Sequence, residues 1–378
     1  DGTMLAFAVD GGLWILAVSA DGTPSGAPRQ IAGEAVDFPS WSSDSQWILF
    51  VTPTGLKRVG LDGGRPQRIE LDLQYEIPAA RGQLLLRDVK IIDGTGASPR
   101  EHQDVLIDGN RIERIGPTGR FVSEDLRTVE GNGRTLIPGL IEMHTHLSLP
   151  AWGSRHGKVW LAYGITSMRT PADSPYRVLE ERESILSSRR VGPRVFFTGG
   201  TIDGDRIYYT GSHAIGDVEE LAQEMQRAFD LEYDLIKTYV RLPDPLQKLV
   251  IEEAHRQGFY VTSHELYPAV AYGVDGIEHV AGTSRRGFSP KLTSLRRSYD
   301  DVIELVARSG VYYTPTVLIY GGWSLARARE PNLLDEDARF VALFPPWSRN
   351  RFLSASPPGD VDASSAAMAP IFSTVEAL

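Results

Sequence analysis

Strand-like and helix-like segments alternate along residues 147–378, and this alternation limits the possible folds more than any other feature. Apolar segments predict strands at 164–169, 194–198, 234–240, 260–264, 276–280 and 311–316. Helices are predicted between several of them, for example at 217–231 and at 245–258, where Gly258 fits a C-terminal cap. Such alternation predicts a parallel α/β fold, and a (β/α)8 barrel of the TIM type is the natural candidate.

Length and charge exclude several classes of protein. The 378 residues are 42% hydrophobic, enough for more than one domain core, and the formal net charge of -10 argues against a nucleic-acid partner. No apolar run approaches the roughly 18 residues of a membrane-spanning helix. The sequence contains no cysteine, which excludes disulfides and thiolate metal sites but does not distinguish a reducing from an oxidising compartment. A signal peptide ahead of Asp1 would make the protein periplasmic or secreted.

Residues 1–78 contain an internal repeat. The segment that begins DGTMLAFAV at Asp1 is similar to the segment that begins DSQWILFVT at Asp44, an offset of 43 residues that fits the blades of a β-propeller. The repeats resemble propellers of the TolB type. About two blades are present, whereas a closed propeller needs at least about four. We therefore expect a partial β-propeller, in a chain that is a fragment at both ends. The alternative is a free-standing β-meander, which the shared turn spacing disfavours.

Residues 82–140 change to short strands with tight Asp-Gly turns. Examples are QLLLRDVKIIDGTG and DVLIDGNRIERIG, which predict the N-terminal part of a small antiparallel β-sandwich. Residues 141–378 then form the predicted barrel domain.

The segment GLIEMHTHLS places two histidines one residue apart. In an extended strand, Glu142, His144 and His146 share one face, so the two imidazoles could grip one divalent metal ion. The alternative is a pair of hydrogen-bonded structural histidines.

Further candidates follow in YDLIKTYVR, YVTSHE and GIEHV. A desolvated, neutral Lys237 can react with carbon dioxide to give a carbamate, whose two oxygens can bridge two metals. The alternative for Lys237 is a buried ion pair. His264 and His279 each stand near the end of a short predicted strand.

Together these motifs resemble the amidohydrolase superfamily, in particular its imidazolonepropionase-like and prolidase-like members, some of which follow a TolB-like propeller. The resemblance runs from about residue 83 to residue 316. It implies that His144 and His146 hold one metal, that His264 and His279 hold the second, and that Lys237 is the carbamylated bridge. Two divalent ions are thus implied, with zinc the first choice for mixed imidazole and oxygen ligands.

Three more residues are candidates for substrate binding. His213 lies on a Gly-rich loop, while Tyr239 and Arg241 follow Lys237 and could bind a substrate carboxylate. Arg241 could equally be a surface residue. The remaining histidines, His102, His156 and His255, are expected in solvated or capping roles.

The resulting prediction is a metal-dependent hydrolase that uses a metal-activated water to cleave the C–N amide bond of a small substrate, such as an N-acyl amino acid or a dipeptide. A mononuclear deaminase is the alternative among enzymes, and a catalytically inactive propeller and barrel binding protein is the alternative from another class. Lys237 discriminates between the two enzymes, since a mononuclear site needs no carbamate.

No catalytic base is identified. The resemblance implies an aspartate at the end of an eighth strand, but no such strand is predicted before Leu378. Glu265 and Glu278 neighbour proposed ligands, so alternation predicts that both point to the opposite face. An open barrel exposes strand edges, which invite pairing with a second chain, including another copy as a homo-oligomer.

Overall fold

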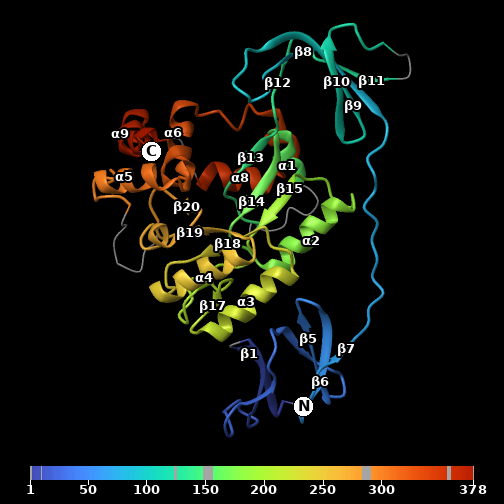
Figure 1. The fold of residues 1–378 in the computed structure, drawn as a ribbon, viewed down its shortest axis with the longest axis vertical. Coiled ribbons are helices and arrows are strands. Elements are labelled where there is room, and N and C mark those ends of the chain that lie inside the picture. Colours follow the sequence, from blue (N-terminus) through green and yellow to red (C-terminus); the bar gives the residue numbers. More distant parts are fainter. Residues whose placement is uncertain are drawn as a thin grey trace.

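Two small antiparallel sheets form the N-terminal region of the protein (Figure 1). The computed structural model describes residues 2–9, 11–122, 126–147, 156–282, 291–355 and 359–377. The first sheet has the order β1-β2-β3 and the second β4-β5-β6-β7. Their bounds are β1 (Met4–Val9), β2 (Gly12–Ala17), β3 (Arg29–Ala32), β4 (Asp37–Trp41), β5 (Trp47–Thr52), β6 (Gly55–Gly60) and β7 (Gln67–Arg68).

The sequence repeat corresponds to a repeated hairpin. Strands β5 and β6 begin and end 43 residues after β1 and β2. Apolar residues of the two sheets, among them Leu13, Ile48 and Phe50, share one core. Asp1, which the repeat aligns with Asp44, lies outside the described residues. The relation to a propeller stays a prediction, because two sheets of three and four strands do not by themselves define one.

An exposed linker without strands or helices, residues 70–82, leads to a five-stranded sheet at the far end of the molecule (Figure 1). The order is β10-β9-β8-β11, and β12 also pairs with β8. The bounds are β8 (Gln83–Ile91), β9 (Arg100–Asp108), β10 (Arg111–Pro117), β11 (Arg127–Glu130) and β12 (Thr135–Leu136).

This sheet differs from the antiparallel arrangement predicted for residues 82–140. Strands β8, β9 and β10 are antiparallel, but β11 and β12 run parallel to β8. After β10 the chain passes Phe121, which is buried against Leu85 and Leu106, before it reaches the other edge of β8. Burial of this aromatic ring favours the crossover over a tight antiparallel turn.

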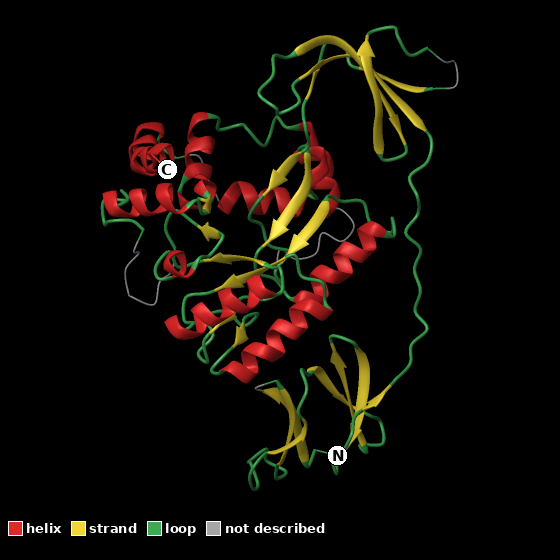
Figure 2. Ribbon diagram, in the orientation of Figure 1, coloured by secondary structure: helices red, strands yellow, loops and turns green. Residues whose placement is uncertain are grey.

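Two parallel sheets form the third region, which Figure 2 shows with its covering helices. One has the order β13-β14-β15 and the other β17-β16-β18-β19-β20-β21. Their bounds are β13 (Leu140–Glu142), β14 (Ile165–Thr170), β15 (Arg194–Phe197), β16 (Ile202–Asp203), β17 (His213–Ala214), β18 (Leu235–Thr238), β19 (Tyr260–Ser263), β20 (Gly276–Glu278) and β21 (Tyr312–Thr314). All six strands predicted in this region are confirmed.

Helices separate most of these strands, and both predicted helices are confirmed as α3 and α4. The bounds are α1 (His156–Ala162), α2 (Pro175–Leu186), α3 (Val218–Asp230), α4 (Asp244–Arg256), η2 (Ala269–Tyr272), α5 (Asp300–Ser309), η3 (Val317–Tyr320), α6 (Gly322–Arg329), α7 (Ala338–Leu343), α8 (Pro346–Ala355) and α9 (Val361–Ala377). Asp217 caps α3 by accepting hydrogen bonds from two backbone N–H groups of its first turn. Met225 of α3, Ile236 of β18 and Ile251 of α4 lie in one buried cluster.

The two parallel sheets meet where β15 approaches the start of β18. The backbone N–H of Asp234 donates to the carbonyl of Phe197 at 2.9 Å, and the Asp234 carboxylate accepts from the Phe197 N–H at 2.9 Å. The arrangement is a mixed α/β fold with parallel strands, while a closed (β/α)8 barrel stays a prediction. In the part of the chain that the structure describes, the segment after β21 holds helices and no further strand.

None of the helices in the described part of the chain combines the length and the apolar character that crossing a bilayer requires.

Candidate active site

A cavity of about 460 Å³ opens where the carboxyl ends of the parallel strands meet. Six of the eight residues proposed from the sequence line it: His144, His146, Lys237, Tyr239, His264 and His279. They come from segments as far apart as β13 and β20, and the parallel order of the strands places their carboxyl ends together. The other two, His213 and Arg241, do not line this cavity.

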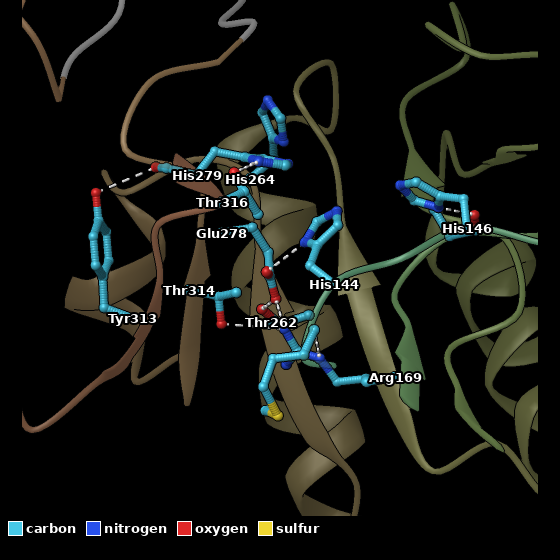
Figure 3. Close-up of polar contacts among 12 residues, drawn as sticks. His144, His146, Arg169, Thr262, His264, Glu278, His279, Tyr313, Thr314 and Thr316 are labelled. Atoms are coloured by element: carbon cyan, nitrogen blue, oxygen red, sulfur yellow. Dashed lines mark hydrogen bonds and ion pairs between the residues drawn. The ribbon is translucent and has the colours of Figure 1, made fainter. Parts of the chain in front are cut away.

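His144 follows β13, and its side chain contacts a buried carboxylate. Its ring Nδ1 lies 2.7 Å from Oε2 of Glu278, as Figure 3 shows. Because a carboxylate only accepts, Nδ1 carries the proton and Nε2 keeps a free lone pair. Burial lowers the pKa of His144 to about 4, which the contact with Glu278 opposes only in part. The ring is therefore neutral at neutral pH, as a metal ligand must be.

Glu278 is fully buried and accepts three hydrogen bonds. Oε2 accepts from His144, as described above. Oε1 accepts from the Arg169 guanidinium and from Oγ1 of Thr262, the latter at 2.6 Å. Burial by itself would raise the pKa of Glu278, but Lys237, His144 and Arg169 together bring that pKa well below its usual range. The carboxylate is thus ionised.

The position of Glu278 corrects the prediction that it points away from the proposed ligands. Strand alternation would place Glu278 and His279 on opposite faces. The backbone of His279 has a φ of 67°, in the left-handed region, and β20 ends at Glu278. Alternation therefore stops at this point, and Glu278 contacts His144 while His279 lines the same cavity. Glu265, in contrast, is not among the residues that line the cavity.

His146 lies nearer the mouth of the cavity, with a side chain that is 41% exposed. Its Nδ1 donates to the carbonyl of Ala172 at 2.7 Å, which leaves Nε2 as the ring nitrogen that this contact does not occupy. The nearby Asp173 carboxylate accepts from the backbone N–H of Leu147 and from Oγ1 of Thr170, both at 2.6 Å. Asp173 thus ties the segment that carries His146 to the end of β14.

Lys237 lies in the middle of β18 and is only 2% exposed. Within the described residues, its Nζ has no hydrogen-bond partner. Burial lowers the pKa of Lys237 to about 8, although Glu278 raises it. A substantial fraction of the side chain is therefore the neutral amine near pH 8. The alternative of a directly paired, buried salt bridge has no support in this geometry.

His264 and His279 complete the cluster of rings. Their ring centroids are 4.7 Å apart, and the His279 ring lies 4.4 Å from that of His144. Burial first, and the Lys237 charge second, keep the pKa of each well below its usual range. Both ring nitrogens of His264 lack partners among the described residues, whereas Nδ1 of His279 forms a hydrogen bond with Oγ1 of Thr316 at 2.7 Å.

This donor set fits divalent metal ions in its chemistry. The imidazoles of His144, His264 and His279 are neutral and clustered. Among the described residues, the ring nitrogens of His264 and Nζ of Lys237 are buried without partners, which costs free energy unless something binds them. The present side-chain positions do not form a finished metal site. In the described part of the chain, no three His, Asp or Glu side chains are close enough together to hold one metal ion. Small rotations of the rings would change the distances between the donor atoms, whereas the burial of these side chains and their places on the strands would stay the same.

Two of the three residues proposed to bind substrate, Arg241 and His213, contact other parts of the protein instead. The Arg241 guanidinium donates to the carbonyls of Arg206 and Ile207 at 3.0 and 2.8 Å, and lies 5.0 Å from the Tyr208 ring centre. It thus holds a loop that places Tyr209 at the cavity. His213 lines a separate cavity of about 490 Å³ beside the N-terminal sheets, where its Nδ1 lies 3.3 Å from Glu224.

Tyr239 does lie at the cavity, with its ring centroid 4.7 Å from that of His264 and 5.5 Å from that of Tyr209. Burial raises the pKa of Tyr239 well above its usual range, so its hydroxyl stays protonated and can donate.

Sequence reasoning missed Arg169, Asp173, Tyr209 and Tyr320, of which the last three line the cavity. Arg169 precedes the end of β14 and Asp173 follows it, so both stand where parallel strands place functional residues. Their position at the end of a predicted strand is the sequence signal that could have identified Arg169 and Asp173 as candidate site residues. The other histidines have local roles, since His102 contacts Asp88, His156 contacts Trp160 and His255 contacts Asp275.

Comparison with known sequences gives short matches. No family model matches the chain. A dihydroorotase from Streptomyces coelicolor is 41% identical over 66 residues, which cover 18% of this chain and 14% of the relative. A 5'-deoxyadenosine deaminase from Methanocaldococcus jannaschii is 39% identical over 49 residues, 13% of this chain and 12% of the relative. The matched region thus spans a small part of each curated relative.

Solved structures match over a longer part of the chain. A Xaa-Pro dipeptidase with bound methionine has a TM-score of 0.54 at 19% identity, covering 78% of this chain and 77% of the other. A prolidase complexed with N-methylphosphonate-L-proline has a TM-score of 0.54 at 16% identity, covering 78% and 76%. At such identities the structural likeness concerns the fold alone. The sequence matches are thus local similarities to a dihydroorotase and a deaminase, and the structural matches, to a dipeptidase and a prolidase, show a shared fold.

Proposed function

We propose that the protein is a metal-dependent hydrolase that cleaves a C–N amide bond of a small substrate, such as an N-acyl amino acid or a dipeptide. The observation that carries the proposal is the convergence of four histidines on one cavity with a buried lysine whose Nζ has no hydrogen-bond partner among the described residues. A volume of about 460 Å³ falls in the range for small-molecule sites. The dipeptidase and prolidase among the structural matches support a substrate of this kind.

His144 and His146 would hold one divalent ion, and His264 and His279 the other, with Lys237 as a carbamate between them. Zinc suits this mixture of imidazole and oxygen ligands best. Bound metal would supply a water of lowered pKa and a Lewis acid for the substrate carbonyl. The neutral amine of Lys237 is the form that reacts with carbon dioxide, and its burial supports that reaction.

The remaining cavity residues would orient the substrate. Tyr239 can donate its hydroxyl to a substrate carboxylate or carbonyl from beside His264. Tyr209 and Tyr320 add aromatic walls that exclude water from the bond to be cleaved. Arg241 contributes indirectly, because it holds the loop that carries Tyr209.

The test is hydrolysis of a panel of N-acyl amino acids and dipeptides, measured with zinc-loaded protein and after removal of metal by a chelator. We expect activity that disappears with the metal, returns with added zinc and is lost in His264→Ala. The matched control is His102→Ala, which removes an exposed histidine of β9. Activity that persists in the chelated protein and in His264→Ala would overturn the proposal.

A mononuclear deaminase is the second candidate, favoured by the local match to a 5'-deoxyadenosine deaminase. It predicts ammonia release from aminopurine nucleosides and one metal ion per chain. It also predicts that Lys237→Ala leaves the metal content unchanged, which the amide hydrolase proposal does not.

A further inference from the structure

Glu278 joins segments from five strands of the parallel region through its side chain and that of Arg169 (Figure 3). One oxygen, Oε2, accepts from His144 after β13, and the other, Oε1, accepts from Arg169 of β14 and Thr262 of β19. Arg169 in turn donates to Oγ1 of Thr314 in β21 at 3.3 Å and to the carbonyl of Met143 at 2.6 Å. The two carboxylate oxygens therefore have different partners.

We propose that Glu278 is a positioning residue that holds His144 in the tautomer with the proton on Nδ1, so that Nε2 is the nitrogen available to a metal ion. Its importance for catalysis rests on the proposed function, but the tautomer itself does not.

The two carboxylate oxygens of Glu278 accept hydrogen bonds from different residues, and this difference determines which oxygen faces His144. Arg169 and Thr262 saturate Oε1 with donors, so Oε2 is left as an acceptor for His144. An imidazole whose Nδ1 donates has its lone pair on Nε2. Carboxylates that orient metal-binding imidazoles in this way typically change metal affinity by about 10- to 100-fold when they are removed.

The left-handed backbone at His279 makes this arrangement compatible with ligation by the next residue. With a φ of 67° at His279, Glu278 contacts His144 while the His279 ring lines the cavity and bonds to Thr316. The backbone contributes as well, because Nζ of Lys291 donates to the carbonyls of His264 and Glu278 at 3.0 and 2.7 Å. Lys291 thus ties together the ends of the two strands that carry His264 and Glu278.

Replacement of Glu278 by Gln should reverse the tautomer. The amide oxygen will stay with Arg169 and Thr262, which are both donors, so the amide NH2 will face His144. Nδ1 of His144 then has to accept, and the proton moves to Nε2, where it blocks metal binding. Thr262→Val is the matched control, because the Arg169 guanidinium still donates to Oε1 in this variant and so keeps Oε2 as the acceptor for His144.

The first measurement needs no variant that alters Glu278. Nitrogen NMR of histidine-labelled, metal-free protein, with His144 assigned by its loss in His144→Gln, reports which ring nitrogen is protonated. We expect the proton on Nδ1. A proton on Nε2 in the wild-type protein would overturn the proposal, and this result stands even if Glu278→Gln does not fold.

The second measurement is zinc affinity by competition with a chelator. We expect Glu278→Gln to carry the Nε2 proton and to bind zinc about 10- to 100-fold more weakly, while Thr262→Val keeps the wild-type tautomer and affinity within about twofold. An unchanged tautomer in Glu278→Gln, or an equal loss in Thr262→Val, would show that Glu278 serves only general stability. Neither readout uses activity, so a failed hydrolase assay leaves this inference separately testable.

Discussion

Asp37 of β4 and Arg227 of α3 form an ion pair between residues that are 190 positions apart in the sequence. The Tyr176 hydroxyl of α2 donates to the same carboxylate at 2.8 Å. Nε of Arg227 donates to Glu224 at 3.0 Å, and the arginine side chain is 7% exposed. This cluster attaches the N-terminal sheets to the helices beside the site, which the exposed linker of residues 70–82 alone would not do.

Asp37→Ala should weaken that attachment. The change leaves a buried guanidinium with one carboxylate partner fewer, which typically costs on the order of 3 kcal/mol. Hydrogen exchange of α3 and of β4 should become faster, because both surfaces gain access to water. Asp72→Ala, in the exposed linker, is the control and should change neither. Unaltered exchange in Asp37→Ala would mean that the attachment does not depend on this ion pair.

Lys237→Ala should reduce the zinc content from two ions per chain to about one. The proposed carbamate is the bridge between the two sites, and alanine offers no oxygen in its place. Elemental analysis of protein purified with zinc and bicarbonate measures the content directly. A value near one in the wild-type protein, unchanged in the variant, would instead favour a mononuclear site.

His144→Ala and His146→Ala should each abolish binding of the metal ion that these two histidines share. Sites with few ligands rarely tolerate the loss of an imidazole. Isothermal titration with zinc should show one binding event fewer in each variant, and His255→Ala, which removes a histidine paired with Asp275, serves as the reference. Retention of two events in both variants would leave the His-x-His motif with a structural role.

Arg241→Ala should raise KM more than it lowers kcat. The loss of two charge-assisted hydrogen bonds to the carbonyls of Arg206 and Ile207 releases the loop that carries Tyr209, but it leaves the histidine cluster in place. We expect KM to rise about tenfold, which corresponds to about 1.4 kcal/mol of binding free energy. Steady-state kinetics on the best substrate provides the test, and a loss confined to kcat would indicate a direct role in the chemical step.

Much of the candidate site could be predicted from the sequence because parallel strands bring their carboxyl ends together. His264 and His279 stand at or near the ends of strands that the apolar pattern already predicts, and Lys237 lies within another. His144 and His146 follow the short strand β13, and all five residues line one cavity. The 43-residue repeat likewise predicted the spacing of the β1–β2 and β5–β6 hairpins, because strand and turn signals are local.

Other features depend on contacts that no local pattern encodes. Glu278 faces His144 because the backbone turns left-handed at His279, and strand alternation cannot anticipate such a break. Arg241 holds a loop, and His213 lies in a different cavity, because the positions of the loops around residues 206–213 are set by packing. The sequence by itself thus determined which residues stand at the strand ends, since that follows from local periodicity. Only the tertiary structure decided which of them share hydrogen bonds, because those contacts join segments as distant as His144 and Glu278.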